Sequence, residues 1–211
     1  MSFFEKFIYQ KPNSISLETC KTIIAYFENE ENRYQGTTVD GVNLDVKNST
    51  DFAIPPDSFE NGENSECKNK WSEICAILSS QLQENVNAYM RELKQHPQLV
   101  SDAYRLLNAN YLTEDTFQIQ KYKKGEGKYI YHHDFLVNWE RRRYRVITFL
   151  WYLNDVFEGG ETEIGGEILV KPEAGKLLLF PACWTFPHRG KVPISHDKYI
   201  VTGWFYINES D

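Results

Sequence analysis

The residue types best suited to metal chemistry lie in one short stretch, residues 131–135, which reads Tyr-His-His-Asp-Phe. Successive side chains on a β-strand point to opposite faces, so His132 and Asp134 would project to the same side while His133 points away. His188 is the best candidate for a second imidazole, contributed by a distant strand. Two histidines and one carboxylate leave coordination positions open, an arrangement typical of non-haem Fe(II) oxygenases.

The short H-x-D pattern does not establish a metal site alone, because such patterns occur by chance in many chains. Its surroundings strengthen the hypothesis. Residues 117–122 alternate like a strand, and residues 124–127, Lys-Gly-Glu-Gly, are typical of a turn that leads into a second strand. We therefore expect the two ligands on a strand that follows a hairpin, a rigid place for a metal site.

A series of further motifs extends from Tyr122 to Trp204. They are His132-x-Asp134-Phe135, Arg145-Val-Ile-Thr148, Tyr152-Leu-Asn-Asp-Val156, Gly159-Gly-Glu-Thr162, Val170-Lys-Pro172, Gly175-Lys-Leu-Leu-Leu-Phe180-Pro181, His188-Arg-Gly190, Val192-Pro193 and Lys198-Tyr199. In this order they resemble the catalytic core of the 2-oxoglutarate- and Fe(II)-dependent dioxygenases, and most of all the prolyl 4-hydroxylase-like branch. Together the motifs are far more specific than H-x-D alone.

The resemblance implies which residues hold the metal and the cosubstrate. Fe(II) would be bound by His132, Asp134 and His188, with 2-oxoglutarate and O2 at the open positions and ascorbate in a supporting role. Lys198 matches the lysine that pairs with the far carboxylate of 2-oxoglutarate in this branch, where many relatives use arginine. A buried carboxylate needs such a cation, because an unpaired buried charge is costly.

Four other residues are expected around the cosubstrate. Tyr122 resembles a family tyrosine whose hydroxyl bonds to the cosubstrate carboxylate, although it lies slightly further from the metal histidine than in the family. Thr148 and Thr202 would add hydroxyl donors, or are ordinary strand residues. Trp204 shares one strand face, expected to point inward, with Lys198 and Thr202.

Contacts with the substrate are less defined by the sequence. Arg189 follows the distal histidine and would bond to substrate or to nearby carboxylates, or else be an ordinary surface arginine. Trp184 is a second candidate for substrate contact. Residues 141–143 are three consecutive arginines, which would attract an acidic substrate, although such a run is more often a solvated edge.

The reaction implied by the resemblance is decarboxylation of 2-oxoglutarate to succinate and CO2, coupled to hydroxylation of an unactivated C–H bond. Peptidyl proline is the first expected substrate. Free amino acids, other protein side chains and small metabolites stay open, because fold and cofactor do not fix the substrate. Alternatives of another class are a cupin-like sugar-binding protein or isomerase and a non-catalytic jelly-roll binding protein. The complete ligand set argues against both, and Asp134 argues against a halogenase.

Composition excludes several classes of protein. The chain has 211 residues, 41% of them hydrophobic, and a net charge of −7, so it can bury a core and is a poor general ligand for nucleic acid. It contains no apolar run long enough to span a bilayer and no convincing signal peptide, so we expect a cytoplasmic protein. The four cysteines form no C-x-x-C pair, which disfavours a structural zinc site, and a reduced compartment fits at least as well as a disulfide framework.

Periodicity predicts a single domain, residues 1–211, of the α+β class and mainly β. Residues 1–115 form a helical and loop support region, with helices from Ser16 to about Asn29 and from Cys67 to about Gln95, loops and short strands over 32–64, and a short helical turn at 103–110. Residues 116–211 change to period two, and the resemblance implies that they form the catalytic core. Strands are expected at 144–152, 162–171, 175–181 and 198–207, giving a double-stranded β-helix, or jelly roll.

Overall fold

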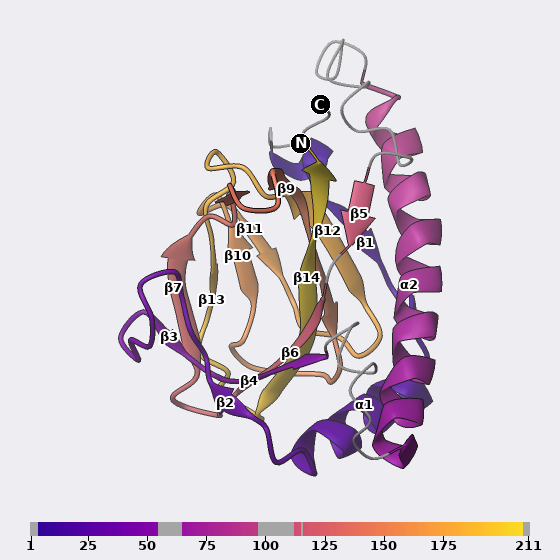
Figure 1. Cartoon of the computed structure of the whole chain (residues 1–211). Helices are drawn as coiled ribbons and strands as arrows, with labels where there is room; N and C mark the ends of the chain where they lie inside the picture. The colour runs from indigo at the N-terminus through magenta and orange to yellow at the C-terminus, as the bar shows by residue number, and fades with distance from the viewer. Residues whose placement is uncertain (1–3, 55–64, 97–111, 115, 209–211) are drawn as a thin grey trace.

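The computed structural model describes residues 4–54, 65–96, 112–114 and 116–208, with the backbone alone for 65–70. Two antiparallel sheets face each other, and two α-helices cover the outer face of the larger sheet (Figure 1). The predicted helical turn at 103–110 lies outside the described residues. Among those that are described, no helix combines the length and the apolar character that a membrane crossing requires.

The two helices form where the sequence predicts them. Helix α1 spans Leu17–Glu28, and the Ser16 side chain accepts a hydrogen bond from the Thr19 backbone N–H at 3.0 Å. Helix α2 spans Ser65–Leu93. A short 3-10 helix, Phe4–Phe7, precedes them. The apolar stripes of α1 and α2 are buried against the larger sheet and form the first core cluster together with side chains of that sheet.

The larger sheet carries the long central strands. Within the described residues its order is β1-β12-β9-β14-β6-β4-β2, with β5 paired to β14 and β8 paired to β9. The strands are β1 Tyr9–Lys11, β2 Tyr34–Gln35, β4 Thr50–Ile54, β5 Leu112–Glu114, β6 Phe117–Tyr122, β8 Val137–Asn138, β9 Arg143–Tyr152, β12 Leu177–Pro181 and β14 Lys198–Asn208. Alternation on β9 sends Phe149 and Trp151 toward the helices and Leu150 and Tyr152 into the space between the sheets.

The smaller sheet lies opposite and closes the space between the sheets. Its order is β11-β10-β13-β7-β3. The strands are β3 Lys47–Asn48, β7 Lys128–His132, β10 Thr162–Ile164, β11 Ile168–Val170 and β13 His188–Gly190. The second core cluster fills the interior between the two sheets, with Tyr152, Leu178 and Phe180 among its most buried members.

Two details differ from the sequence predictions. Residues 162–171 form a hairpin, β10 and β11, rather than one strand, because Gly165 and Gly166 adopt positive φ values of 63° and 72° and turn the chain back. Strand β7 ends at His132, so Asp134 lies just beyond the strand rather than on it. The strands expected over 144–152, 175–181 and 198–207 are confirmed by β9, β12 and β14.

Candidate active site

Three potential metal ligands meet on the inner side of the smaller sheet. His132 ends β7, Asp134 follows it, and His188 opens β13 directly opposite His132. One ligand atom from each residue lies within 4.8 Å of the others. Nε2 of His132 is 3.6 Å from Asp134 Oδ1, and Nε2 of His188 is 3.4 Å from Asp134 Oδ2. The structure therefore brings together the three residues that the sequence singled out.

Hydrogen bonds behind the two imidazoles determine which nitrogen faces the cluster. Nδ1 of His132 lies 2.8 Å from the Ile130 carbonyl oxygen, and Nδ1 of His188 lies 3.1 Å from that of Phe186. A carbonyl oxygen only accepts hydrogen bonds, so each Nδ1 carries the proton and each Nε2 presents a lone pair. Two such nitrogens and a carboxylate converge, and only a cation between them balances this arrangement. The donor set fits Fe(II).

The charge states also suit metal binding. Burial, reinforced by the neighbouring His188, lowers the pKa of His132 to about 4, so this imidazole is neutral at pH 7. Burial of Asp134 acts to raise its pKa, but His188, His132 and the Thr148 hydroxyl outweigh it and hold the pKa below the usual range. A neutral imidazole and an ionised carboxylate are the forms that bind a metal.

Aromatic rings hold the two imidazoles in place. The Tyr129 ring stacks on His132 at a centroid distance of 3.5 Å and an interplanar angle of 14°. Phe180 packs edge-on against His188 at 4.7 Å. Sequence reasoning missed Tyr129, because regular alternation places it on the face opposite to His132.

A β-bulge explains why Tyr129 faces inward. His132 pairs with His188 and Tyr129 pairs with Gly190, so three steps along β7 oppose two steps along β13. An extra residue in one strand shifts the alternation of side chains beyond it. Tyr129 and His132 therefore share the inner face, while Ile130 and Tyr131 between them are exposed.

Lys198 lies at the other end of a narrow cavity that also contains the three ligands. Its side chain is buried, with 2% of the residue exposed, and Nζ donates to the Gly160 carbonyl oxygen at 3.0 Å. Within the described part of the chain it forms no ion pair. Burial lowers the pKa of Lys198 to about 8, while Glu161 acts in the opposite direction. A buried ammonium without a counterion fits an incoming carboxylate.

The other predicted cosubstrate residues line the same cavity. The Tyr122 hydroxyl donates to Gln120 Oε1 at 2.6 Å, and its ring centroid is 4.6 Å from Lys198 Nζ. The Thr148 hydroxyl donates to Asp134 Oδ2 at 2.7 Å. The Thr202 hydroxyl donates to the Phe149 carbonyl oxygen at 2.9 Å. Both threonine protons are thus already used within the protein.

Trp204 separates the narrow cavity from a wider cleft of about 840 Å³ that it also lines. The Arg145 guanidinium stacks on its ring, with Cζ 3.4 Å from the centroid, and Arg145 Nε donates to the Tyr206 hydroxyl at 3.3 Å. The indole Nε1 of Trp204 is buried and finds no hydrogen-bond partner among the residues that the structure describes. The sequence motifs include Arg145 but do not predict it as a site residue, because its stacking partner comes from a different strand.

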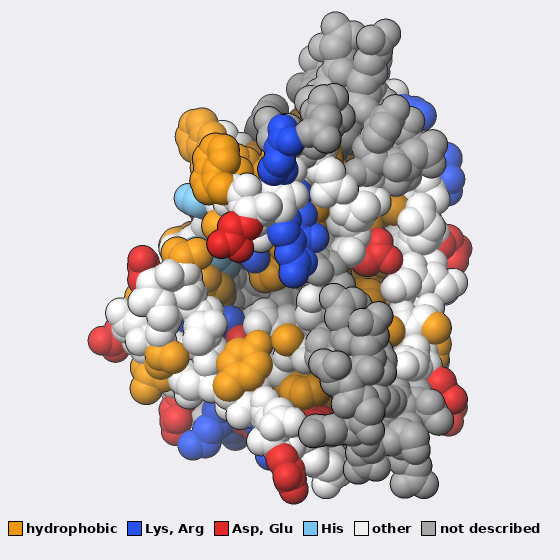
Figure 2. All heavy atoms as spheres, viewed as in Figure 1, with side chains coloured by type: hydrophobic (Ala, Val, Ile, Leu, Met, Phe, Trp, Pro, Cys, Tyr) orange, Lys and Arg blue, Asp and Glu red, His pale blue; other side chains and the backbone are white. Residues whose placement is uncertain are grey.

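Charged, aromatic and histidine side chains surround the hollow on this side of the molecule (Figure 2). His133 lines the wider cleft but does not belong to the metal cluster. Arg189 also lines the narrow cavity, but its guanidinium is bound to Glu163: Nε and Nη2 donate to Glu163 Oε2 at 3.0 and 2.7 Å. Trp184 follows β12, is 70% exposed and lines neither cavity around the cluster.

Comparison with known proteins agrees with this site. Residues 117–206 match the family model described as the 2OG-Fe(II) oxygenase superfamily. A search of curated protein sequences gave no significant match. The matched segment contains the three ligand residues and Lys198.

Several solved structures share the fold. A viral collagen prolyl hydroxylase from Paramecium bursaria Chlorella virus-1, in complex with 2OG, has a TM-score of 0.63 and 18% identity, covering 98% of this chain and 99% of that one. A Trichoplax adhaerens prolyl hydroxylase with a hypoxia inducible factor peptide has a TM-score of 0.66 and 19% identity, covering 96% and 84%. A Pseudomonas putida prolyl-4-hydroxylase has a TM-score of 0.58 and 18% identity, covering 94% and 91%.

These likenesses confirm the predicted double-stranded β-helix, since each structure covers nearly all of this chain. The family match supplies what fold alone does not, namely the cofactor requirement. Residues 117–206, which contain the His-Asp-His cluster and Lys198, are thus similar to the 2OG-Fe(II) oxygenase superfamily, and Fe(II) and 2-oxoglutarate are the metal and cosubstrate that this similarity supports.

Proposed function

We propose that this oxygenase hydroxylates prolyl residues in peptides, with His132, Asp134 and His188 as the iron ligands. The observation that carries the ligand assignment is the convergence of two imidazole lone pairs and one carboxylate, with each imidazole fixed by a carbonyl at Nδ1. When bound, Fe(II) with 2-oxoglutarate activates O2. One oxygen atom enters the C–H bond of the substrate, the other enters succinate, and CO2 is released.

Lys198 is proposed to bind the far carboxylate of 2-oxoglutarate. Its ammonium is buried in the cavity of the cluster, and its one hydrogen bond among the described residues goes to a backbone carbonyl, so two protons on Nζ are available to an anion. Tyr122 lies against Lys198, and its hydroxyl, which donates to Gln120 Oε1, would turn to donate to the arriving carboxylate. Thr148 keeps Asp134 oriented through its hydroxyl.

The wider cleft is proposed to hold an extended peptide. Trp204 presents a buried indole N–H without a partner in the described part of the chain, and a peptide carbonyl is an acceptor that would satisfy it. Arg145, stacked on the same indole, offers further donors at this point. The similarity in fold to prolyl hydroxylases, one of them bound to a peptide, favours proline as the target.

The first experiment measures succinate formation from 2-oxoglutarate with Fe(II) and ascorbate, with and without a proline-rich peptide. We expect the peptide to stimulate turnover and to gain the mass of one oxygen atom per succinate. His132→Ala is the control without activity. Succinate formation without peptide dependence would keep the enzyme class and reject peptidyl proline as the substrate.

A further inference from the structure

Three side chains on the outer face of the smaller sheet lie directly behind the metal ligands. Tyr131 on β7, Arg189 on β13 and Glu163 on β10 come from neighbouring strands. Tyr131 precedes His132 in the chain, and Arg189 follows His188. Because adjacent strand residues point to opposite faces, this outer cluster shares its backbone with the inner ligand cluster.

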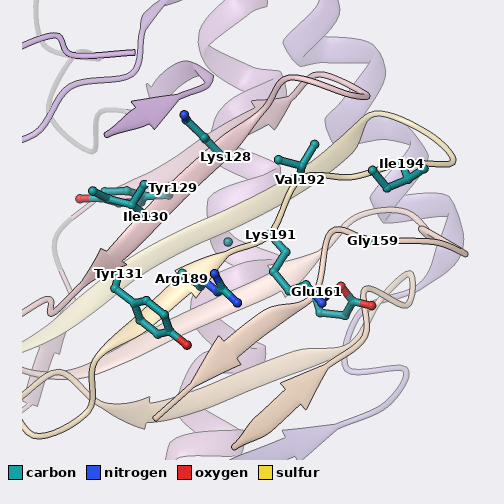
Figure 3. A pocket seen from close by; sticks show the side chains of 11 residues that line it. Lys128, Tyr129, Ile130, Tyr131, Gly159, Glu161, Arg189, Lys191, Val192 and Ile194 are labelled. Carbon is teal, nitrogen blue, oxygen red and sulfur yellow. Dashed lines mark ion pairs between the residues drawn. The ribbon is translucent and has the colours of Figure 1, made fainter. Parts of the chain in front are cut away.

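Glu163 joins the other two members of the outer cluster. Its carboxylate accepts both Arg189 hydrogen bonds on Oε2, at 3.0 and 2.7 Å, and the Tyr131 hydroxyl donates to Oε1. The guanidinium of Arg189 lies 4.9 Å from the Tyr131 ring centroid, and Figure 3 shows these two side chains next to each other. Glu163 therefore reaches across β13 and links β10 to β7.

This link lies where the backbone ladder is irregular. The bulge between Tyr129 and His132 interrupts the pairing of β7 with β13 at the level of Arg189. Regular ladder hydrogen bonds fix the separation of antiparallel strands, and a bulge disrupts them locally. At this level the Glu163 carboxylate supplies an alternative connection between the two strands that carry His132 and His188.

The burial of the carboxylate distinguishes this cluster from an ordinary surface ion pair. Only 8% of Glu163 is exposed, although Arg189 and Tyr131 are partly open to solvent. Exposed pairs contribute little, because water and salt screen them. Lys191 and Glu161 form a separate pair at 3.2 Å further along the same face (Figure 3).

We propose that Glu163 is a positioning residue for the metal site. By holding Tyr131 and Arg189 together on the outer face, it fixes the β7 bulge and thereby the spacing and orientation of His132 and His188. This inference rests on the proposed iron ligands. The hydrogen bonds support this role, since the Arg189 guanidinium and the Tyr131 hydroxyl both donate to the Glu163 carboxylate.

The test is the affinity for Mn(II), measured without 2-oxoglutarate from the electron paramagnetic resonance signal of the free ion. Glu163→Gln keeps the shape but removes the charge, and we expect Mn(II) binding about tenfold weaker, in the range found when supporting partners of ligands are removed. The matched control is Glu126→Gln, which removes an exposed carboxylate paired with Lys123 just before β7. Its affinity should equal that of the parent chain.

Tyr131→Phe and Arg189→Gln each remove one partner of Glu163. If Glu163→Gln does not fold, the Mn(II) affinity of these two variants replaces it as the test. If the three residues act as one unit, the effects of Tyr131→Phe and Glu163→Gln on Mn(II) affinity will be less than additive. The visible spectrum of bound Co(II) provides a second readout, since a general loss of stability does not change ligand geometry.

The outcomes separate this inference from the proposed function. A parent chain that binds no Mn(II) would contradict the ligand assignment, and this inference with it. If the parent binds Mn(II) and the folded Glu163 and Tyr131 variants bind it equally well with an unchanged Co(II) spectrum, the positioning role is wrong while the metal site stands.

Discussion

The Thr148 hydroxyl donates a hydrogen bond to Asp134 Oδ2 at 2.7 Å, linking the middle of β9 to the segment that follows β7. Asp134 lies outside the regular ladder of its own sheet, so this contact with the opposite sheet helps to fix its carboxylate. The metal cluster thus depends on both sheets, although all three ligands come from one side of the interior.

Replacing Thr148 with valine removes this hydrogen bond at nearly constant volume. We expect the affinity for Mn(II) to fall about tenfold, because an unsupported carboxylate samples other orientations. Titration calorimetry would measure the dissociation constant, with Thr22→Val on α1 as an isosteric control. An unchanged dissociation constant for Thr148→Val would show that packing alone orients Asp134.

Lys198→Met keeps the length of the side chain and removes its charge. A hydrogen bond to a charged group contributes about 2 kcal/mol, so the KM for 2-oxoglutarate should rise about 30-fold. Without cosubstrate the variant should be at least as stable as the parent, since it no longer buries an ammonium. Steady-state kinetics and urea unfolding measure the two effects, with the exposed Lys123→Met as control. A normal KM would reject Lys198 as the carboxylate partner.

The pKa of Lys198 predicts opposite effects of pH on binding and stability. Burial lowers it from 10.5 to about 8. Between these values the unfolded chain binds the proton and the folded chain does not, so this residue makes the free energy of unfolding rise with pH. Binding of 2-oxoglutarate requires the ammonium and should weaken above pH 8. The free energy of unfolding and the affinity for 2-oxoglutarate are each measured against pH in the parent and in Lys198→Met. Both pH trends should be absent from the variant. If parent and variant show the same trends, other groups cause them.

Trp204→Phe retains a ring for Arg145 to stack on but lacks the indole N–H. If this donor binds the peptide backbone, the KM for the peptide should rise about fivefold, corresponding to roughly 1 kcal/mol for one hydrogen bond. Succinate formation without peptide should not change. A rise in the KM for 2-oxoglutarate instead would assign the indole to the cosubstrate, as the sequence alone predicts.

A buried ion pair at the rim of the site gives a stability prediction. Lys47 Nζ on β3 lies 2.6 Å from Asp51 Oδ2 on β4, and the Ser49 hydroxyl donates to Asp51 Oδ1 at 2.7 Å. Asp51→Ala leaves an unpaired buried ammonium and should lower the free energy of unfolding by about 3 kcal/mol or more. The double variant Lys47→Met/Asp51→Leu buries no charge and should lose less stability. Urea denaturation measures both losses, and equal losses would mean that the unpaired charge is not the cause.

Local pattern predicted much of this fold. The apolar stripes of α1 and α2, the cap at Ser16 and the alternation of β9 and β14 are properties of short segments, and all of them are confirmed. The burial of Lys198 followed from its apolar neighbours in the strand. The ligand residues were found because their types are rare and their order matched a known family.

The features that sequence reasoning missed depend on contacts between distant segments. The sequence predicts one strand over residues 162–171, whereas the structure has a hairpin that turns at Gly165 and Gly166. The residue types are compatible with one long strand and with two short ones, and only the pairing of β10 with β11 distinguishes them. The inward position of Tyr129 arises from pairing with Gly190 across the sheet. The partner of Arg189 is set by the register of β10 against β13, which brings Glu163 opposite it. No window of the sequence contains these relationships.

The β7 bulge constrains the chain in a way that residue identity does not express. Because three steps along β7 oppose two along β13, removing either Ile130 or Tyr131 would restore regular alternation and leave both rings on the inner face. It would also leave a single outward side chain where Ile130 and Tyr131 are now exposed. The extra residue thus gives this segment a second outward side chain, and one of the two, Tyr131, bonds to Glu163 behind the candidate metal ligands.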